Sequence, residues 1–166
     1  MTTEQQNLIE NDVNAINNEE IADPVRALDY MKAFASAQAT RTEIYHEFES
    51  ALSDYTAGSI SIQQIQQVIR IAQEGFQDVS SDILRQERLL LQIHRMELAN
   101  LIRKVQDLEE QKLRATVTLL SFRVQALSQP DISFDYQMEE LENRLKSLFD
   151  EINQVMEESR AEMMDL

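Results

Sequence analysis

The residues best placed for metal chemistry are Glu43 and His46. They lie three positions apart, and helical di-iron proteins use two such Glu-x-x-His pairs together with two further glutamates. His94 is the only other histidine, and the residue three positions before it is Leu91, so the second pair is missing. We therefore expect Glu43 and His46 to lie on the outer side of a helix, and we expect no metal or other cofactor.

Motifs for nucleophilic catalysis or phosphate binding are missing as well. The sequence has no Gly-x-Ser-x-Gly, no phosphate loop and no glycine-rich dinucleotide fingerprint, and its two glycines stand far apart. Only two histidines are available as imidazole bases. We therefore expect no catalytic residues and a protein that is not an enzyme.

A lysine interrupts an apolar helical seam in residues 102–120. Apolar residues recur there at alternating three- and four-residue steps, the spacing of a helix that packs along a seam. Lys112 falls within this seam, with Glu109 three positions before it. It could lie at the edge of the seam and extend its ammonium group into water. Alternatively, it could pair with an acid of a neighbouring helix, such as Glu47 or Glu49, and specify the register of packing.

Arg41, Tyr45 and Phe48 share a second notable helical face. Tyr45 and Phe48 are most simply core residues, and Arg41 could then pair with an acid across the bundle. An exposed patch of arginine and aromatic residues would instead indicate a binding hot spot. Core packing is the interpretation that we favour.

Turn signals divide the chain into helices, because glycine and proline number only two each. Asp23 is suited to cap a helix and Pro24 to its first position. This first core helix is predicted to run to about Tyr55 and to end at Gly58.

A second helix is predicted to begin at Ser61, which forms a capping-box pattern with Gln64. Gly75 lies beside its apolar stripe and should permit a close helix approach. The apolar phase shifts by one residue between the second and third stripes, which predicts a break or reversal near 86–97. Pro130 then ends the third helix.

A fourth helix is expected from about Asp135, with an apolar stripe over 138–155. The predicted fold is all-α: an elongated antiparallel three-helix bundle or coiled coil with an additional C-terminal helix. The predicted parts are an acidic, polar N-terminal arm, a helical core domain and an acidic amphipathic C-terminal helix, at residues 1–22, 23–129 and 130–166. The last helix could pack on the bundle or mediate homo-oligomerisation through 138–155.

The charge of the chain restricts its partners. The formal net charge is −15, and two acidic ends flank a middle part that is nearly neutral. An acidic chain repels phosphate groups, so direct binding of nucleic acid or of a membrane surface is disfavoured. Nothing in the sequence approaches the roughly 20 apolar residues that span a bilayer. The chain has no cysteine, which is compatible with a reducing compartment, and we expect an intracellular protein of the nucleus or cytoplasm.

Three segments in this order and spacing resemble the Required-for-Excision B-type domain family of DNA repair proteins. They are the tract from Arg41 to Tyr55, the tract 76–83 and the seam segment 102–113, and the resemblance covers about residues 34–122. The family supplies no catalytic residues and implies a role in repairing damaged DNA. The matching residues are Arg41, Tyr45, Phe48 and Tyr55 in the first tract, Phe76, Ser80 and Ile83 in the second, and Gln106, Leu108, Glu109, Lys112 and Leu113 in the third.

These observations lead to two hypotheses for function. The first is a non-enzymatic helical interaction module, an adaptor in excision-type DNA repair that acts through protein partners. The second is a coiled-coil assembly subunit of a cytoskeletal or trafficking complex. The aromatic face of 41–55 favours the first hypothesis, whereas the regular stripe of 138–155 favours the second.

Overall fold

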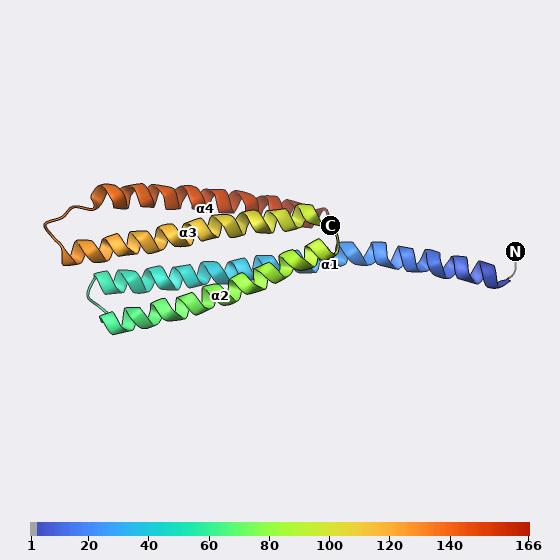
Figure 1. Ribbon diagram of the computed structural model, residues 1–166, viewed down its shortest axis with the longest axis horizontal. Helices are drawn as coiled ribbons and strands as arrows, with labels where there is room; N and C mark the ends of the chain where they lie inside the picture. Colours follow the sequence, from blue (N-terminus) through green and yellow to red (C-terminus); the bar gives the residue numbers. More distant parts are fainter. Residues whose placement is uncertain (1–2) are drawn as a thin grey trace. The chain divides into compact units, whose positions relative to one another are not determined.

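Four helices make up the part of the chain that the structure describes. The computed structural model describes the backbone of residues 3–166 and the side chains of residues 23–166. The helices are α1 (Thr3–Thr56), α2 (Ile62–Gln92), α3 (Met96–Ser128) and α4 (Asp135–Met164) (Figure 1). The prediction of an all-α fold is confirmed. The chain divides into two compact units, whose boundary lies within α3 after Ala99.

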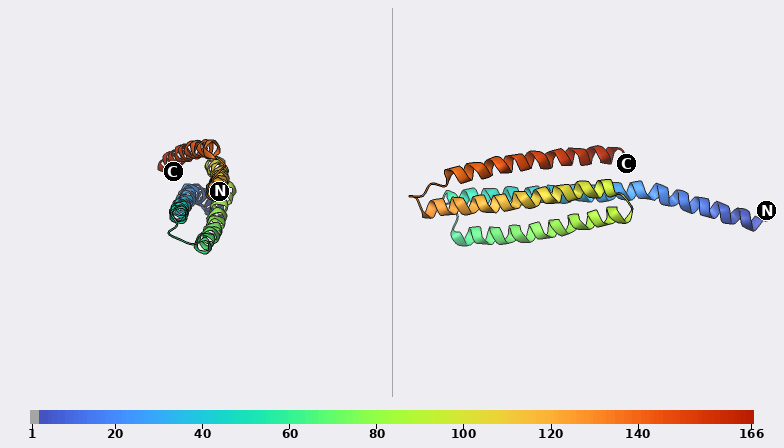
Figure 2. Two further views of the ribbon diagram at one scale, coloured as in Figure 1. Left: turned by 90° about the vertical axis from the view of Figure 1, so that its left-hand side faces the viewer. Right: turned by 45° about the horizontal axis from the view of Figure 1, so that its top comes forward.

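The helices pair as two antiparallel hairpins, α1 with α2 and α3 with α4. Figure 2 shows the pairing of α3 with α4 from two further directions. The prediction of a three-helix bundle with an additional C-terminal helix is therefore wrong about which helices pair. The physical reason is that α4 carries a regular apolar stripe of its own, which packs within the chain and buries Leu148, Ile152 and Val155.

Helix α1 begins well before the predicted start. It runs without interruption from Thr3 and contains Pro24, so Asp23 does not begin a helix. A proline inside a helix removes one backbone hydrogen bond and commonly bends the helix without ending it. The predicted arm at residues 1–22 is thus helical from residue 3, and its side chains lie outside the described residues.

The first hairpin is held by one continuous stripe on α1. Its buried residues follow alternating four- and three-residue steps, so they form a single seam along the helix. They are Ala27, Met31, Phe34, Gln38, Arg41, Tyr45, Phe48 and Leu52. The buried apolar residues of α2 are Ile65, Ala72, Val79, Ile83 and Leu90.

Gly75 lies where the two helices of this hairpin approach closely. A Cβ atom built on Gly75 would lie 2.9 Å from Cδ1 of Ile44 on α1. That separation is shorter than a normal contact between carbon atoms. The predicted role of this glycine in close helix approach is confirmed.

The same backbone motif ends α1 and α2. Gly58 is left-handed, with φ of 75°, and the N–H groups of Gly58 and Ser59 donate to the carbonyls of Tyr55 and Asp54. These are the two hydrogen bonds of a Schellman motif. Helix α2 then begins with the predicted capping box: the N–H of Gln64 donates to Oγ of Ser61 over 3.2 Å, and the N–H of Ser61 donates to Oε1 of Gln64 over 2.8 Å.

His94 takes the place of glycine at the end of α2. Its φ is 59°, and the N–H groups of His94 and Arg95 donate to the carbonyls of Leu91 and Leu90. The break predicted within 86–97 is confirmed, and residues 60–128 form two helices. A histidine in this conformation is strained, because its Cβ crowds the following carbonyl oxygen.

The second hairpin combines polar and aromatic contacts. Nη2 of Arg123 on α3 lies 3.1 Å from Oε1 of Glu142 on α4. Nη2 of Arg144 on α4 donates to Oε1 of Gln111 on α3 over 2.6 Å. Phe122 packs on Phe134, the residue that precedes α4, with 5.5 Å between the ring centroids.

The strain at His94 yields a stability prediction. Replacing His94 by glycine (H94G) should raise the free energy of unfolding by roughly 1 kcal/mol, because glycine reaches φ of 59° without the Cβ clash. Urea denaturation followed by circular dichroism would measure it. The matched control is Gly58→Ala, which should be destabilised because alanine would then carry the same strain. Equal or lower stability of H94G would contradict the strain argument.

A second prediction concerns pH. The side-chain hydrogen bond from Arg95 is the main cause that lowers the pKa of Glu97 below its ordinary value of 4.5, against the opposing effect of burial. A lowered pKa means that the ionised carboxylate stabilises the fold above the ordinary value, and that this stability is lost as the pH falls through the folded-state pKa. Because the Glu97 side chain is half exposed, the effect is only about 0.2–1 kcal/mol.

Glu97→Gln should therefore be slightly less stable than the natural chain near neutral pH. The difference should shrink as the pH falls below the ordinary glutamate pKa. Urea denaturation midpoints of both proteins across this range would measure it. A difference that stays constant from neutral to about pH 3 would contradict the prediction.

Candidate functional site

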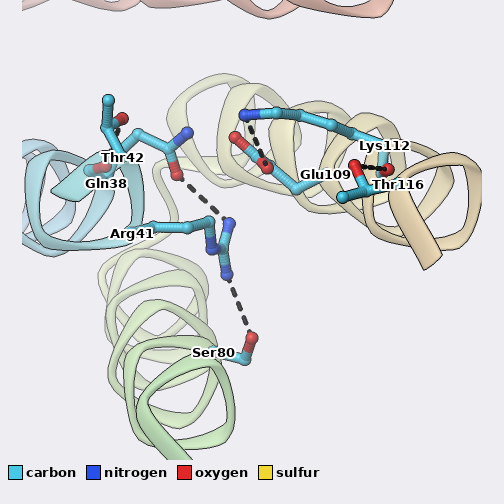
Figure 3. Close-up of polar contacts among 7 residues, drawn as sticks. All are labelled: Gln38, Arg41, Thr42, Ser80, Glu109, Lys112 and Thr116. Atoms are coloured by element: carbon cyan, nitrogen blue, oxygen red, sulfur yellow. Dashed lines mark hydrogen bonds and ion pairs between the residues drawn. The ribbon is translucent and has the colours of Figure 1, made fainter. Parts of the chain in front are cut away.

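Arg41 lies at the centre of the seam between α1 and α2. Its side chain is only 3% exposed. Nη1 donates to Oε1 of Gln38, one turn earlier on α1, over 3.1 Å, and Nη2 donates to Oγ of Ser80 on α2 over 3.0 Å. Figure 3 shows the guanidinium group pointing from α1 toward Ser80. The favoured interpretation of Arg41 as a core residue is confirmed, and an exposed hot spot at this residue is excluded.

Aromatic packing continues the seam beyond this polar cluster. The rings of Tyr45 on α1 and Phe76 on α2 are tilted by 53°, with 4.6 Å between their centroids. Such pairs add about 0.5–1.5 kcal/mol beyond the area that they bury. Phe48 is also buried, and Tyr55 is half-buried near the end of α1. The predicted residues of the first two tracts thus lie along one hairpin.

Gln106, Glu109 and Lys112 form a second group on α3. Glu109 is buried, and Gln106 is half-buried. Nζ of Lys112 lies 3.8 Å from Oε2 of Glu109, one turn earlier on the same helix (Figure 3). The Lys112 side chain is 15% exposed, so most of it lies within the packed part of the chain. The position of its ammonium group at the seam edge and its pairing with Glu47 or Glu49 both stay predictions.

Buried polar residues that the sequence analysis missed lie at seam positions. Gln38 supplies an acceptor to Arg41, and Glu87 is buried on α2. Ser159 is buried on α4, where its hydroxyl donates to the carbonyl of Val155 over 2.9 Å. The burial of Gln38 was predictable from the sequence, because it lies four residues after Phe34 and three before Arg41 and so continues the alternating steps of the α1 seam.

The side chains of these two groups are placed to pack helices and to form hydrogen bonds and ion pairs within the chain. A guanidinium group stays protonated and only donates hydrogen bonds, so Arg41 can hold acceptors but cannot exchange protons near neutral pH. Glu43 and His46 are exposed on α1. Among residues 23–166, no group of three histidine or acidic side chains is placed to hold a metal ion. No helix in this same range is long and apolar enough to cross a membrane.

Comparison with known proteins identifies relatives of this chain. Residues 29–123 match the family described as DNA repair REX1-B, which confirms the resemblance found in the sequence. The matched range contains most of the α1–α2 hairpin and α3 as far as Arg123. The chain is also 35% identical over 127 residues to the heterochromatin silencing protein rss1 of Schizosaccharomyces pombe. That alignment covers 76% of this chain and 92% of the relative.

The Arg41–Ser80 hydrogen bond yields a third prediction. Replacing Ser80 by alanine (S80A) should lower the free energy of unfolding by about 1–2 kcal/mol, because a buried charged donor loses an acceptor. Urea denaturation would measure the loss. The control is Ser81→Ala at the exposed neighbouring position, which should change stability by less than about 0.5 kcal/mol. Equal effects of the two substitutions would show that this hydrogen bond contributes nothing measurable.

Proposed function

The chain belongs to the REX1-B DNA repair family, and from this membership we propose that it is a non-enzymatic helical adaptor that acts in DNA repair by binding other proteins. The observation that carries the proposal is the family match over residues 29–123. This range holds every motif residue of the two groups described above. The family match therefore covers most of the α1–α2 hairpin and of α3, whereas α4 lies outside the matched range.

The way the motif residues are used supports an adaptor over an enzyme. Arg41, Tyr45 and Phe48 are buried in a helix seam, and Arg41 donates to neighbouring side chains. Residues used in this way shape and stabilise a helical surface. An adaptor needs such a rigid surface, and its binding energy comes from side chains that the surface presents.

The net charge supports action through proteins. A chain with a formal charge of −15 is repelled by the phosphates of DNA, which weakens any contact that does not use a local basic surface. A role in repair would then depend on other proteins that hold the DNA or perform the chemistry. We place this role in the nucleus, where damaged chromosomal DNA is repaired.

The relative in fission yeast favours a second candidate function. That relative is a heterochromatin silencing protein, and the alignment covers nearly all of it. We therefore consider a role in silencing chromatin as the alternative, carried by the same helical surfaces. On either proposal the chain would act by binding other proteins, so the two candidates differ in pathway more than in physical mechanism.

A genetic experiment tests the repair proposal. Cells that lack this protein should survive ultraviolet damage less well than parental cells, and the natural chain should restore survival. Unirradiated cultures are the control for general sickness. Unchanged survival after irradiation would remove the main support for a repair role. Affinity purification of the chain should recover repair proteins, and recovery of filament or vesicle components instead would favour an assembly subunit.

Complementation separates the two candidates. The chain would be expressed in fission yeast that lack rss1, and silencing of a heterochromatic reporter gene would be measured beside ultraviolet survival. Restored silencing with no effect on survival would favour the silencing function over the repair adaptor. Restored survival without restored silencing would favour repair.

A further inference from the structure

Helix α3 carries a second apolar stripe, in which four of the five side chains are exposed and Leu120 is half-buried among the residues that the structure describes. Its members are spaced four, three, four and three residues apart, so they lie on one face of the helix. Val117 is 55% exposed and Leu127 is 58% exposed, which is high for apolar residues in a regular row. The members are Leu113, Val117, Leu120, Val124 and Leu127; we call them the outer stripe. Contiguous exposed apolar rows of this kind mark interaction sites.

The outer stripe faces away from α4. The α3 residues that contact the α4 side of the hairpin are Gln111, Phe122 and Arg123. With 3.6 residues per turn, Gln111 and Phe122 lie about half a turn around the helix from the centre of the outer stripe. Pairing with α4 therefore leaves this face of α3 open.

The residue types in the outer stripe indicate what kind of helix could pack against it. In heptad notation Val117 and Val124 are a positions, and the three leucines are d positions. In parallel coiled coils, β-branched residues at a with leucine at d favour two strands over three or four. We propose that a second copy of this chain docks here, so that two α3 helices form a short parallel coiled coil through their outer stripes.

The edges of the outer stripe are compatible with a second copy. In a parallel pair, Thr116 at a g position would face Ser121 of the second copy, and Arg123 would face Ser128 of the second copy. Neither pairing brings like charges together, which would oppose association. A self-complementary stripe is also what a two-fold symmetric dimer requires, because both copies present the same surface.

The outer stripe is long enough to form a coiled coil, because helix α3 is already formed within the single chain. Residues 113–127 span just over two heptads, which is short for a coiled coil that must also form its helices. Here the stripe lies within a helix of 33 residues that α4 holds in place. In contrast, Leu148, Ile152 and Val155 of the 138–155 stripe are already buried within one chain. That leaves the outer stripe as the better surface for self-association.

Oligomeric state in solution tests the proposal. Analytical ultracentrifugation of the natural full-length chain at about 100 µM should give a mass near twice 19.3 kDa. Val117→Glu (V117E) should give the monomer mass, because a dimer would bury a charge at an a position. The matched control is Thr118→Glu (T118E), which adds the same charge at an exposed α3 position outside the stripe and should remain dimeric. A monomeric natural chain, or a V117E dimer as stable as the natural one, would overturn the proposal.

Folding of the variant is checked separately. Glutamate has a higher helix propensity than valine, so V117E should keep the helix content and denaturation midpoint of T118E. The comparison of mass then reports on association alone.

Cysteine cross-linking tests the parallel arrangement, because the natural chain has no cysteine. Val117→Cys should form a disulfide-linked dimer, since identical a positions meet across a parallel pair within the short distance that a disulfide needs. Thr118→Cys is the control and should not cross-link. A disulfide that forms only between Leu113→Cys and Val124→Cys chains, when these are mixed, would indicate an antiparallel pair, in which d positions face a positions, and would overturn the parallel geometry.

Discussion

The first hairpin depends on a buried guanidinium group that must find hydrogen-bond acceptors. Arg41 lies in the middle of a seam that is otherwise apolar or aromatic, with Gln38 on its own helix and Ser80 on α2 as acceptors. A buried charge without acceptors is strongly destabilising, so a shift of α2 along α1 would be opposed by the loss of the Ser80 contact. The same register brings Tyr45 against Phe76. The hydrogen bond from Arg41 to Ser80 and the contact of Tyr45 with Phe76 thus favour the same register of α2 along α1.

Short connections make this register possible. Both α1 and α2 end in a left-handed residue with the same pair of backbone hydrogen bonds, and the following helix begins within a few residues. Gly58 adopts this conformation readily, whereas His94 is strained by it. The tight connection at Gly58 favours the pairing of α1 with α2, because neighbours in the sequence meet with little loss of chain entropy.

The proposed function rests on helical surfaces and assigns no role to reactive groups. The family match covers the hairpin and most of α3, and its motif residues are mainly those that build these elements. As the proposed adaptor, the chain would contribute rigid helical faces to an assembly. On the proposal for the outer stripe, α3 would serve both packing and binding, since one side packs against α4 and another is apolar and exposed.

The sequence by itself determined the helical class, most helix ends and the family. The capping box at Ser61, the glycine at 58 and the reversal near residue 94 were predictable, because each depends on hydrogen bonds among residues a few positions apart. The sequence also placed Arg41, Tyr45 and Phe48 in a core, although the continuation of α1 through Pro24 contradicted a local signal.

Only the tertiary structure decided which helices pair and what meets the buried polar groups. Any apolar stripe can pack on another, so the spacing in 138–155 could not reveal that α4 would close on α3. For the same reason Ser80 as acceptor for Arg41, the low exposure of Lys112 and the open face of α3 were not predictable. The burial of a side chain depends on contacts with segments far away in the sequence, and the residue pattern of one helix does not specify those contacts.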